Sequence, residues 1–417
     1  MEARDAGIVM RVTEGMVVPL VGLYCQKYAE MADCLSEPQS RAQSNFPALY
    51  WDYTVREPIG VVGCIVPWNF PLFLGAWKLI PALIAGNTIV MKPSSTASLS
   101  LLELTKLFDS RGLHEGVFNV VTGPGAETGN ALVEHPLVDK LIMTVSTDIG
   151  KQVMRKASRD LKRVTLELGG KNPAILLDDV DLEMAADGVL FGGLLHQGQV
   201  CMSGSRVSIP QHKYDDFVHL IAERAATLVL GDPMDSDVDL GPVVSRRQLE
   251  TIKGYIETGK NEGARLVCGG KSPEGEMFKK GFWMEPTIFA DATHDMVTSR
   301  EEIFGPVISL IPYEDEDEVI SMANDTDYGL TAGVWGTDIE RANKMAQKLR
   351  AGTVFINDWH MLNPNFPFGG YKQSGIGREG GIEGLYEFTE IKTVHINIKR
   401  TREESFWFQL LLGNADS

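Results

Sequence analysis

The sequence contains few cysteines, and they follow no recognisable pattern. Among 417 residues there are five, at Cys25, Cys34, Cys64, Cys201 and Cys268. Their number is odd, their spacing is scattered and no Cys-x-x-Cys pair occurs, which argues against a disulfide framework and a cysteine-based zinc site. We therefore expect no bound metal and a reducing, cytoplasmic environment.

Positive charge is also scarce. Lysine and arginine together number 39 against 56 aspartates and glutamates, so the formal net charge is −17. Such acidity repels the phosphate backbone of nucleic acids and the anionic surface of membranes. We therefore expect neither nucleic acid nor membrane as a partner.

Signals for secretion and for membrane insertion are missing as well. The start, MEARDAGIVMRVTEG, lacks the basic residues and the apolar run of a signal peptide. Residues 59–91 are apolar enough to suggest a spanning helix, but prolines such as Pro71 and Pro81 and polar residues such as Lys78 interrupt them. The pattern favours buried strands and a buried helix instead.

Short β-branched runs alternate with longer amphipathic runs along most of the chain. The first of them predict strands over 60–67 and 88–94 around a helix over 73–86, and the same order restarts after residue 170. Strand–helix–strand repetition implies right-handed crossovers. We therefore predict an α/β protein with a parallel, doubly wound sheet and a second α/β domain.

Two segments read as extended ribbons outside this alternation, residues 48–60 and 392–400. Exposed ribbons of this kind pair with other chains. We therefore expect a homo-oligomer, either a dimer or a tetramer. The tail, residues 401–417, has no predicted structure.

Three residues are candidates for covalent chemistry. Cys201, in LLHQGQVCMSGSR, is either a reactive thiol or a small buried hydrophobe. Asn69, in PWNFP, is either an oxyanion donor or a partner of its own loop. Glu167, in LELGGKNP, is either a buried general base with a raised pKa or the partner of Lys171 or Arg163.

A phosphate site is suggested at two places between a strand and a helix. TGPGAETG, which contains Gly125 and Gly129, departs from GxGxxG spacing, so a plain turn is an equal alternative. Ser146, in VSTDIG, either caps the following helix or meets a phosphate.

Two further motifs are candidates for ribose binding. Lys92, in MKPS, ends a strand where ligands of α/β sheets bind, and is either solvated or bonded to ribose hydroxyls. In REEIFGPV, one of Glu301 and Glu302 is solvated, and the other is able to accept two hydrogen bonds from a ribose diol.

Taken together, these ordered motifs resemble the aldehyde dehydrogenase superfamily, and PFGGYKQSGIGRE adds another typical segment. The likeness extends from about residue 1 to about residue 396. It implies a Rossmann-like dinucleotide domain over 1–169, with the ribbon inside it, and a catalytic domain over 170–370. Residues 371–400 would return to the oligomerisation sheet.

The resemblance also implies roles for the candidate residues. In the family, the residue that matches Cys201 is a nucleophilic thiolate, and the residue that matches Asn69 donates to the oxyanion. The residue that matches Glu167 is the base that activates the hydrolytic water. The implied cofactor is NAD or NADP, and its binding residues would be Trp68, Lys92, Ser95, Ser146, Gly125, Gly129, Glu302 and Phe304.

The implied aldehyde pocket is apolar. Its expected lining residues are Phe70, Leu74, Trp77, Leu195, Met202, Leu362 and Phe366. A full aromatic cage for a trimethylammonium group is not evident, and no arginine is present to hold a carboxylate, so we expect medium aliphatic or aromatic aldehydes. His196 and His360 are expected to be structural.

Three departures from the family pattern bear on this interpretation. Ser95 stands where NAD-preferring members carry a glutamate, which favours acceptance of NADP. Val145 replaces a glycine before the phosphate-binding serine, which narrows the approach of a cofactor. The chain also begins inside a helix that relatives reach later, so apolar surface is expected to be exposed.

Two other functions remain open at this point. A catalytically impaired family member acting as a binding or assembly subunit is consistent with Val145 and the late start. A cysteine hydrolase using Cys201 and His196 would leave the Lys92 and Glu302 motifs without a use.

Overall fold

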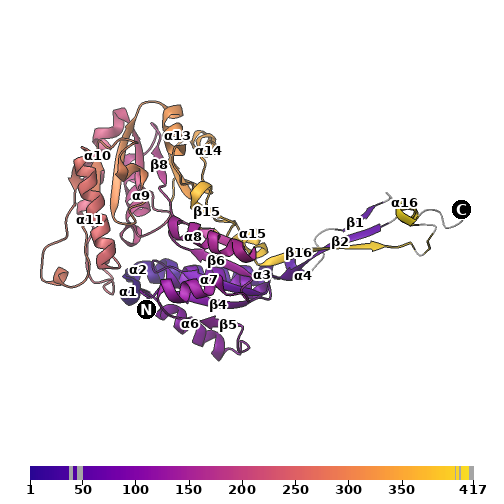
Figure 1. Ribbon diagram of the computed structural model, residues 1–417. Coiled ribbons are helices and arrows are strands. Elements are labelled where there is room, and N and C mark those ends of the chain that lie inside the picture. Colours follow the sequence, from indigo (N-terminus) through magenta and orange to yellow (C-terminus); the bar gives the residue numbers. More distant parts are fainter. Residues whose placement is uncertain (37–40, 45–49, 400, 403–404, 413–417) are drawn as a thin grey trace.

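The computed structural model describes residues 1–36, 41–44, 50–399, 401–402 and 405–412. The strands of these residues form sheets of six, seven and three strands. The two larger sheets and their helices make up the main body, while the third sheet projects from it as a long ribbon (Figure 1).

The six-stranded sheet has the order β15-β7-β6-β3-β4-β5. The five strands β3 to β7 are parallel, as predicted, and β15 is antiparallel to β7. β15 brings the C-terminal segment back to this sheet before the chain enters the ribbon. The bounds are β3 Val61–Val66, β4 Thr88–Pro93, β5 Phe118–Val120, β6 Lys140–Thr144, β7 Arg163–Glu167 and β15 Gly375–Ile376.

The main helix of this half, α5 (Pro71–Ile84), is apolar on nearly every side and is buried along most of its length. Pro71 occupies its first turn, where a missing N–H group costs no hydrogen bond. The N-terminal helix α3 (Val18–Met31) packs on it, with the Tyr24 ring at 5.5 Å from that of Trp77. The other elements of this half are α1 Glu2–Ala6, α2 Met10–Val12, η1 Thr13–Val17, α4 Asp33–Ser36, α6 Leu99–Ser110, η2 Gly125–Gly129, α7 Asn130–Glu134, α8 Thr147–Ala157 and η3 Ser158–Asp160.

The seven-stranded sheet has the order β10-β11-β12-β9-β8-β13-β14, and only β10 is antiparallel to its neighbour. The sequence interpretation did not identify β9, β10 and β11 as strands. The bounds are β8 Pro173–Leu176, β9 Arg206–Pro210, β10 Arg265–Cys268, β11 Thr287–Ala290, β12 Val307–Tyr313, β13 Thr331–Trp335 and β14 Thr353–Ile356.

Helices follow these strands in the predicted order, and side chains cap several of them. Asp181 accepts from the N–H of Met184 at the start of α9, and Ser245 accepts from that of Gln248 at the start of α11. The bounds are α9 Leu182–Leu194, η4 Leu195–Gly198, η5 Gln211–Lys213, α10 Tyr214–Ala226, α11 Arg246–Asn261, η6 Met277–Lys279, α12 Val297–Arg300, α13 Glu316–Asn324 and α14 Ile339–Ala346.

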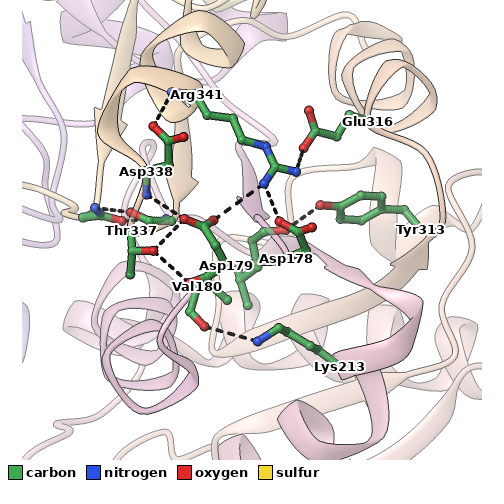
Figure 2. A network of polar contacts seen from close by, with 12 residues as sticks. Asp178, Asp179, Val180, Lys213, Tyr313, Glu316, Thr337, Asp338 and Arg341 are labelled. Carbon is green, nitrogen blue, oxygen red and sulfur yellow. Dashed lines mark hydrogen bonds and ion pairs between the residues drawn. The ribbon is translucent and has the colours of Figure 1, made fainter.

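A polar network ties α13 and α14 to the end of β8 (Figure 2). The Arg341 guanidinium on α14 contacts the carboxylates of Asp178 and Glu316. Asp179 accepts from the hydroxyl of Thr337 and from the N–H of Asp338, both at 2.6 Å. The network thus holds the helices α13 and α14 against the carboxyl end of β8.

The ribbon consists of β2 (Tyr50–Pro58), β16 (Thr389–Asn397) and the short β1 (Arg41–Ser44). β2 and β16 pair antiparallel from Thr389 opposite Pro58 to Asn397 opposite Tyr50. The two segments predicted as ribbons therefore pair with each other, although residues 48, 49 and 400 lie outside the described residues.

The C-terminal segment continues past the ribbon. Its described elements are η7 Lys372–Ser374, α15 Gly381–Tyr386, η8 Phe406–Phe408 and α16 Gln409–Leu412. The Trp407 ring lies 5.6 Å from that of Tyr50, so the tail packs beside β2. Residues 413–417 of the tail lie outside the described residues. Within the described part of the chain, no helix combines the length and hydropathy needed to cross a membrane.

Candidate active site

Cys201 lies where two cavities meet. It follows a turn in which His196, Gln197 and Gly198 all have left-handed backbones, with φ of 49°, 59° and 63°. The same loop runs against Gly170, where an added Cβ would lie 2.6 Å from the Cys201 carbonyl oxygen. Only glycine permits this approach, so the loop is held tightly against the segment that follows β7.

The first cavity is narrow, about 60 Å³, and almost entirely apolar. Six of the expected pocket residues line it, and so do Cys201, Asn69 and Glu167. The rings of Phe73 and Phe368 stack beside Trp77 at 5.0 and 5.4 Å between centroids. The six are Phe70, Leu74, Trp77, Leu195, Met202 and Leu362.

Phe366 does not line this cavity, so this pocket prediction was wrong. Its side chain is 65 % exposed, because a turn closed by the Phe366 N–H and the Asn363 carbonyl turns it outward. Residues that the sequence interpretation missed occupy the wall instead. They are Met16, Val17, Leu20, Phe73, Val200 and Phe368.

Met16, Val17 and Leu20 come from η1 and α3, near the start of the chain. Their amphipathic spacing resembles that of any packed helix, so no local signal marks them as pocket residues. Phe368 belongs to the PFGGYKQSGIGRE segment, so this motif could have indicated it as a pocket residue.

The second cavity is a long cleft of about 750 Å³ beside the carboxyl ends of β3, β4 and β6. This is where α/β sheets bind their ligands, and the volume suits a large ligand. All eight expected cofactor residues line it: Trp68, Lys92, Ser95, Gly125, Gly129, Ser146, Glu302 and Phe304. Val145 also lines it.

Two of these residues, Ser146 and Lys92, keep hydrogen-bonding capacity on the side of the cleft. Ser146 stands at the N-cap position of α8 but makes no side-chain capping hydrogen bond, so the capping alternative is wrong. Lys92 is buried rather than solvated, and its Nζ donates to the Pro93 carbonyl at 2.9 Å. An ammonium group has two more hydrogens to donate.

Glu302 reaches into the cleft from the loop after α12. Its Oε1 accepts the N–H of Gly170 at 3.1 Å, and an added Cβ on Gly169 would lie 2.4 Å from its Oε2. The two glycines after Glu167 therefore make room for this carboxylate. Burial raises the pKa of Glu302 to about 7. Glu301, by contrast, is exposed and accepts the Tyr255 hydroxyl.

Glu167 ends β7 and points into the narrow cavity. Both of its carboxyl oxygens are buried without a hydrogen-bond partner, so the ion pair with Lys171 or Arg163 is absent. Arg163 pairs with Glu390 instead. Burial, reinforced by nearby Glu379, raises the pKa of Glu167 well above its usual range.

Behind Glu167 lies a buried ion pair that the sequence interpretation missed. Lys78 Nζ on α5 lies 2.7 Å from Oε1 of Glu379, and it donates to the Thr144 hydroxyl at 2.8 Å. Both charged side chains are almost fully shielded from solvent. Lys78 and Glu379 are 301 positions apart, so a single sequence carries no signal that pairs them.

The surroundings of Cys201 favour the thiol over the thiolate, and the nucleophilic role expected for Cys201 stays a prediction. Burial raises its pKa to about 12, and the charges of Glu302 and Glu167 act in the same direction. The N–H groups of Met202 and Cys201 oppose this shift. The proton must therefore leave the sulfur when it attacks a substrate.

Asn69 connects the PWNFP loop to the cysteine loop. Its Nδ2 donates to the Gln199 carbonyl at 3.0 Å, so it does not bond to its own loop. One amide hydrogen remains for another acceptor beside Cys201. His196 and His360 are buried, and burial lowers their pKa values to about 3 and about 4, so both are neutral.

Metal-ligand clusters were not expected, and none of three or more His, Cys, Asp or Glu side chains occurs among the described residues.

The model of the aldehyde dehydrogenase family matches residues 1–394. The chain is 47 % identical over 350 residues to a putative aldehyde dehydrogenase, DhaS, of Bacillus subtilis, covering 84 % of this chain and 70 % of the relative. It is 46 % identical over 346 residues to betaine aldehyde dehydrogenase of Brucella anthropi, covering 83 % and 71 %. The chain therefore belongs to the aldehyde dehydrogenase family.

Solved structures agree with this assignment. An aldehyde dehydrogenase from Bacillus cereus in complex with NAD⁺ superposes with a TM-score of 0.91 at 43 % identity, over 95 % of this chain and 79 % of that one. A betaine aldehyde dehydrogenase from Staphylococcus aureus in complex with NAD⁺ gives 0.93 at 38 % identity, over 96 % and 78 %.

Proposed function

We propose that this chain oxidises small aldehydes to carboxylic acids, with NAD or NADP as the hydride acceptor. One observation carries the proposal: Cys201 and Asn69 lie in the walls of both cavities, so a group bound in either one meets the same sulfur. In this proposal Cys201 is a nucleophile that lies between an apolar channel and a cleft whose side chains would bind phosphate and ribose.

In the first step Cys201 Sγ would form a bond to the aldehyde carbon while its proton passes to a water molecule and on to solvent. The carbonyl oxygen gains the electron pair of the C=O π bond. The free amide hydrogen of Asn69 and the backbone N–H of Cys201 would donate to this oxygen and stabilise the thiohemiacetal. Asn69 and Cys201 are far apart in sequence, and the hydrogen bond from Asn69 to the Gln199 carbonyl holds their loops together.

The cleft has the groups that a dinucleotide requires. Lys92 and Glu302 would bond to ribose hydroxyls, and Ser146 at the start of α8 would meet a phosphate. The free Ser146 hydroxyl and the room made by Gly169 fit this use. NAD or NADP bound there supplies the acceptor for the hydride that leaves the former aldehyde carbon, which turns the thiohemiacetal into a thioester.

Glu167 would then take a proton from water as the water oxygen attacks the thioester carbon. The C–S bond breaks, the acid leaves, and the sulfur recovers a proton. The raised pKa of Glu167 suits it to accept a proton near neutral pH. A glutamate in this place favours hydrolysis over transfer of the acyl group to coenzyme A.

The narrow cavity favours uncharged, slim aldehydes. Its wall is apolar, no arginine or lysine lines it, and the carboxyl groups of Glu167 and Glu379 would repel a carboxylate-bearing aldehyde. Four phenylalanine and tryptophan rings line it, of which the sequence interpretation had placed Phe70 and Trp77 there and had missed Phe73 and Phe368. We therefore expect short or medium aliphatic aldehydes to react faster than semialdehydes, with betaine aldehyde as the informative cationic comparison.

Ser95 supports the use of NADP as well as NAD. It lines the cleft without a carboxylate that would repel a 2′-phosphate. The ratio of kcat/KM with NAD to that with NADP measures this preference. A ratio far above one would contradict the hypothesis.

The decisive test is the appearance of reduced nicotinamide absorbance when an aldehyde and either dinucleotide are added. Cys201→Ala should abolish it, whereas Cys268→Ala, at a half-buried cysteine whose Sγ lies 3.7 Å from the Pro286 carbonyl, should not. Glu167→Gln should give one rapid turnover per site and then stall, because the thioester is not hydrolysed. Oxidation by Cys201→Ala at the parent rate would refute the mechanism.

A further inference from the structure

Gln199 lies two residues before Cys201, and the chemistry proposed above makes no use of its side chain. This side chain is fully buried, at 0 % exposed. Its Nε2 donates to the His196 carbonyl at 3.1 Å, and its Oε1 accepts the N–H of Val244 at 2.9 Å. A buried amide that bonds through both ends holds the segments that it joins. Gln199 thus ties the cysteine loop to a residue 45 positions away.

The turn that Gln199 closes has a strained backbone. His196 and Gln197 have φ of 49° and 59°, in the left-handed region that residues other than glycine disfavour. Such a backbone persists only where its surroundings hold it in place. The backbone N–H and the side chain of Gln199 both donate to the His196 carbonyl, each at 3.1 Å, so one residue fastens this turn twice.

The segment on the other side of this contact, residues 241–244, is itself held in place. The N–H of Val243 donates to the Phe282 carbonyl at 2.7 Å. Gln197 Nε2 donates to the Gly241 carbonyl, also at 2.7 Å, so a second glutamine of the cysteine loop reaches the same segment. The cysteine loop is therefore fastened to a firm support at two points.

The backbone of Gln199 carries the contact to Asn69. The Gln199 carbonyl accepts one Nδ2 hydrogen of Asn69 at 3.0 Å, which leaves the second amide hydrogen for an acceptor beside Cys201. Asn69 is buried, so its amide has little room to choose another partner. Because this carbonyl and the buried side chain belong to one residue, the place of the carbonyl depends on the anchorage of the side chain.

We propose that Gln199 is a positioning residue that directs the free amide hydrogen of Asn69 toward the oxyanion formed at Cys201. The inference rests on the proposed function, in which Asn69 stabilises the thiohemiacetal. A hydrogen-bond donor contributes most when it is already aimed at the place where charge develops. Without the two side-chain hydrogen bonds of Gln199, the strained turn relaxes, its carbonyl shifts and the Asn69 amide turns with it.

The other side of Cys201 is held separately. The Asn172 side chain donates to the carbonyls of Cys201 and Ser203, both at 2.9 Å, and accepts the N–H of Thr331 at 3.0 Å. The sulfur therefore keeps this support when the Gln199 side chain is changed. Loss of the glutamine should weaken the stabilisation of an oxyanion and leave the thiol in its place.

The test compares two reactions of Cys201 that need no dinucleotide. Attack on p-nitrophenyl acetate passes through an oxyanion and releases nitrophenolate, whereas alkylation by iodoacetamide displaces iodide without forming an oxyanion. Gln199→Met should lower kcat/KM for nitrophenolate release by about tenfold, a part of what a whole oxyanion donor contributes. The rate of Cys201 alkylation, followed by peptide mass, should stay at the parent value. Gln199→Leu is a second apolar variant in case the methionine variant does not fold.

A double-mutant cycle separates this role from a general loosening of the fold. In an Asn69→Ala background, Gln199→Met should have little further effect on nitrophenolate release, because the amide that it positions is gone. The matched control is Gln248→Met, which removes a side chain whose Nε2 donates to the carbonyls of Ile303 and Phe304, both at 3.0 Å. Its effect should be the same with and without the Asn69 amide.

Parent kcat/KM for nitrophenolate release in folded Gln199→Met would overturn the proposal. A loss that is equally large in the Asn69→Ala background, or that extends equally to alkylation, would also overturn it. Parent kcat/KM in Asn69→Ala alone would refute the oxyanion role of Asn69 and this proposal with it. Aldehyde oxidation by Cys201 is measured separately, by reduced nicotinamide absorbance, so that activity stands or falls on its own.

Discussion

At the scale of single residues, burial governs the chemistry of this site. Glu167 is buried and Cys201 is partly buried, and desolvation raises the pKa of each. Among the described residues the Glu167 carboxyl oxygens have no hydrogen-bond partner, and the charges acting on Cys201 are acidic. The surroundings of both groups therefore favour their neutral forms over their ionised forms.

This arrangement predicts that the rate rises with pH. Both groups must lose a proton to work, and a raised pKa means that the active ionised forms appear only at higher pH. The kcat/KM for an aldehyde, measured at saturating cofactor, should climb from about pH 6 to about pH 9. A flat profile over this range would show that neither group titrates in the free enzyme.

A second prediction concerns Val145, which lines the cofactor cleft just before Ser146. Its N–H donates to the Glu167 carbonyl at 3.1 Å, so the backbone there is held by β7 and the side chain cannot move aside. Val145→Gly should therefore lower the dissociation constant for the dinucleotide. Val164→Gly, at a partly buried valine of β7 in the same core cluster that does not line the cleft, serves as a control for lost packing. Equal constants for parent and Val145→Gly would contradict the prediction.

At the scale of elements, polar networks at strand ends hold the helices that frame the second sheet. Arg341 contacts Asp178 at the end of β8 and Glu316 on α13, so one side chain joins three elements (Figure 2). The same helix carries an exposed pair, Lys344 with Glu340, within a single turn. Arg341 thus links three elements, whereas the Lys344–Glu340 pair lies within one helix.

Arg341→Met should therefore lower the free energy of unfolding by about 1 kcal/mol or more, since it leaves three neighbouring carboxylates without their cation. The matched change on the same helix, Lys344→Met, should cost no more than about 0.5 kcal/mol. Urea unfolding of both variants measures the difference. Equal midpoints would mean that the network contributes no more than an ordinary surface pair.

At the scale of the whole molecule, the ribbon stands apart from the main body, and among the described residues the tail packs beside it through Trp407 and Tyr50. The ribbon extends away from the body, and it exposes Trp51 and Ile396, which lie opposite each other on β2 and β16 (Figure 1). Cross-strand apolar pairs of this kind are stabilised when another surface covers them. We propose that the ribbon joins copies of this chain into a dimer or a tetramer.

The proposal predicts that the Trp51→Glu/Ile396→Lys double variant loses subunit association. The two new charges attract each other across the strands, so the ribbon keeps its pairing while its surface becomes polar. Light scattering after gel filtration should show a smaller mass than for the parent. Glu57→Gln/Lys392→Gln, at an exposed ion pair of the same ribbon, is the control. A parent that is itself a monomer would refute the proposal.

The domain boundaries at 169/170 and 370/371 remain predictions that proteolysis or separate expression could test. The sheets are compatible with the first boundary, because β3 to β7 end at Glu167 and β8 begins at Pro173. The boundary at 370/371 does not separate two sheets, because β15, at Gly375–Ile376, pairs with β7 in the six-stranded sheet of the first domain. The C-terminal segment thus connects both the body and the ribbon.

The sequence by itself determined the order of the elements and the identity of the groups that react. Alternating apolar runs are local signals, so β3, α5 and β4 could be predicted from the sequence alone. Motif residues such as Cys201 and Glu167 were likewise recognised from their immediate neighbours. Their placement at one junction depends on how the two sheets pack, because Glu167 ends β7 of the six-stranded sheet whereas Cys201 lies in the loop before β9 of the seven-stranded sheet.

Only the tertiary structure decided how these groups are charged and what surrounds them. The ion pair of Lys78 with Glu379, the isolation of Lys171 and the outward turn of Phe366 depend on segments far apart in sequence. A pKa is set by burial and by charges from every packed element, none of which a local pattern records. For this reason the candidate sulfur could be named from the sequence, whereas the burial and charges that shift its pKa are visible only in the packed site.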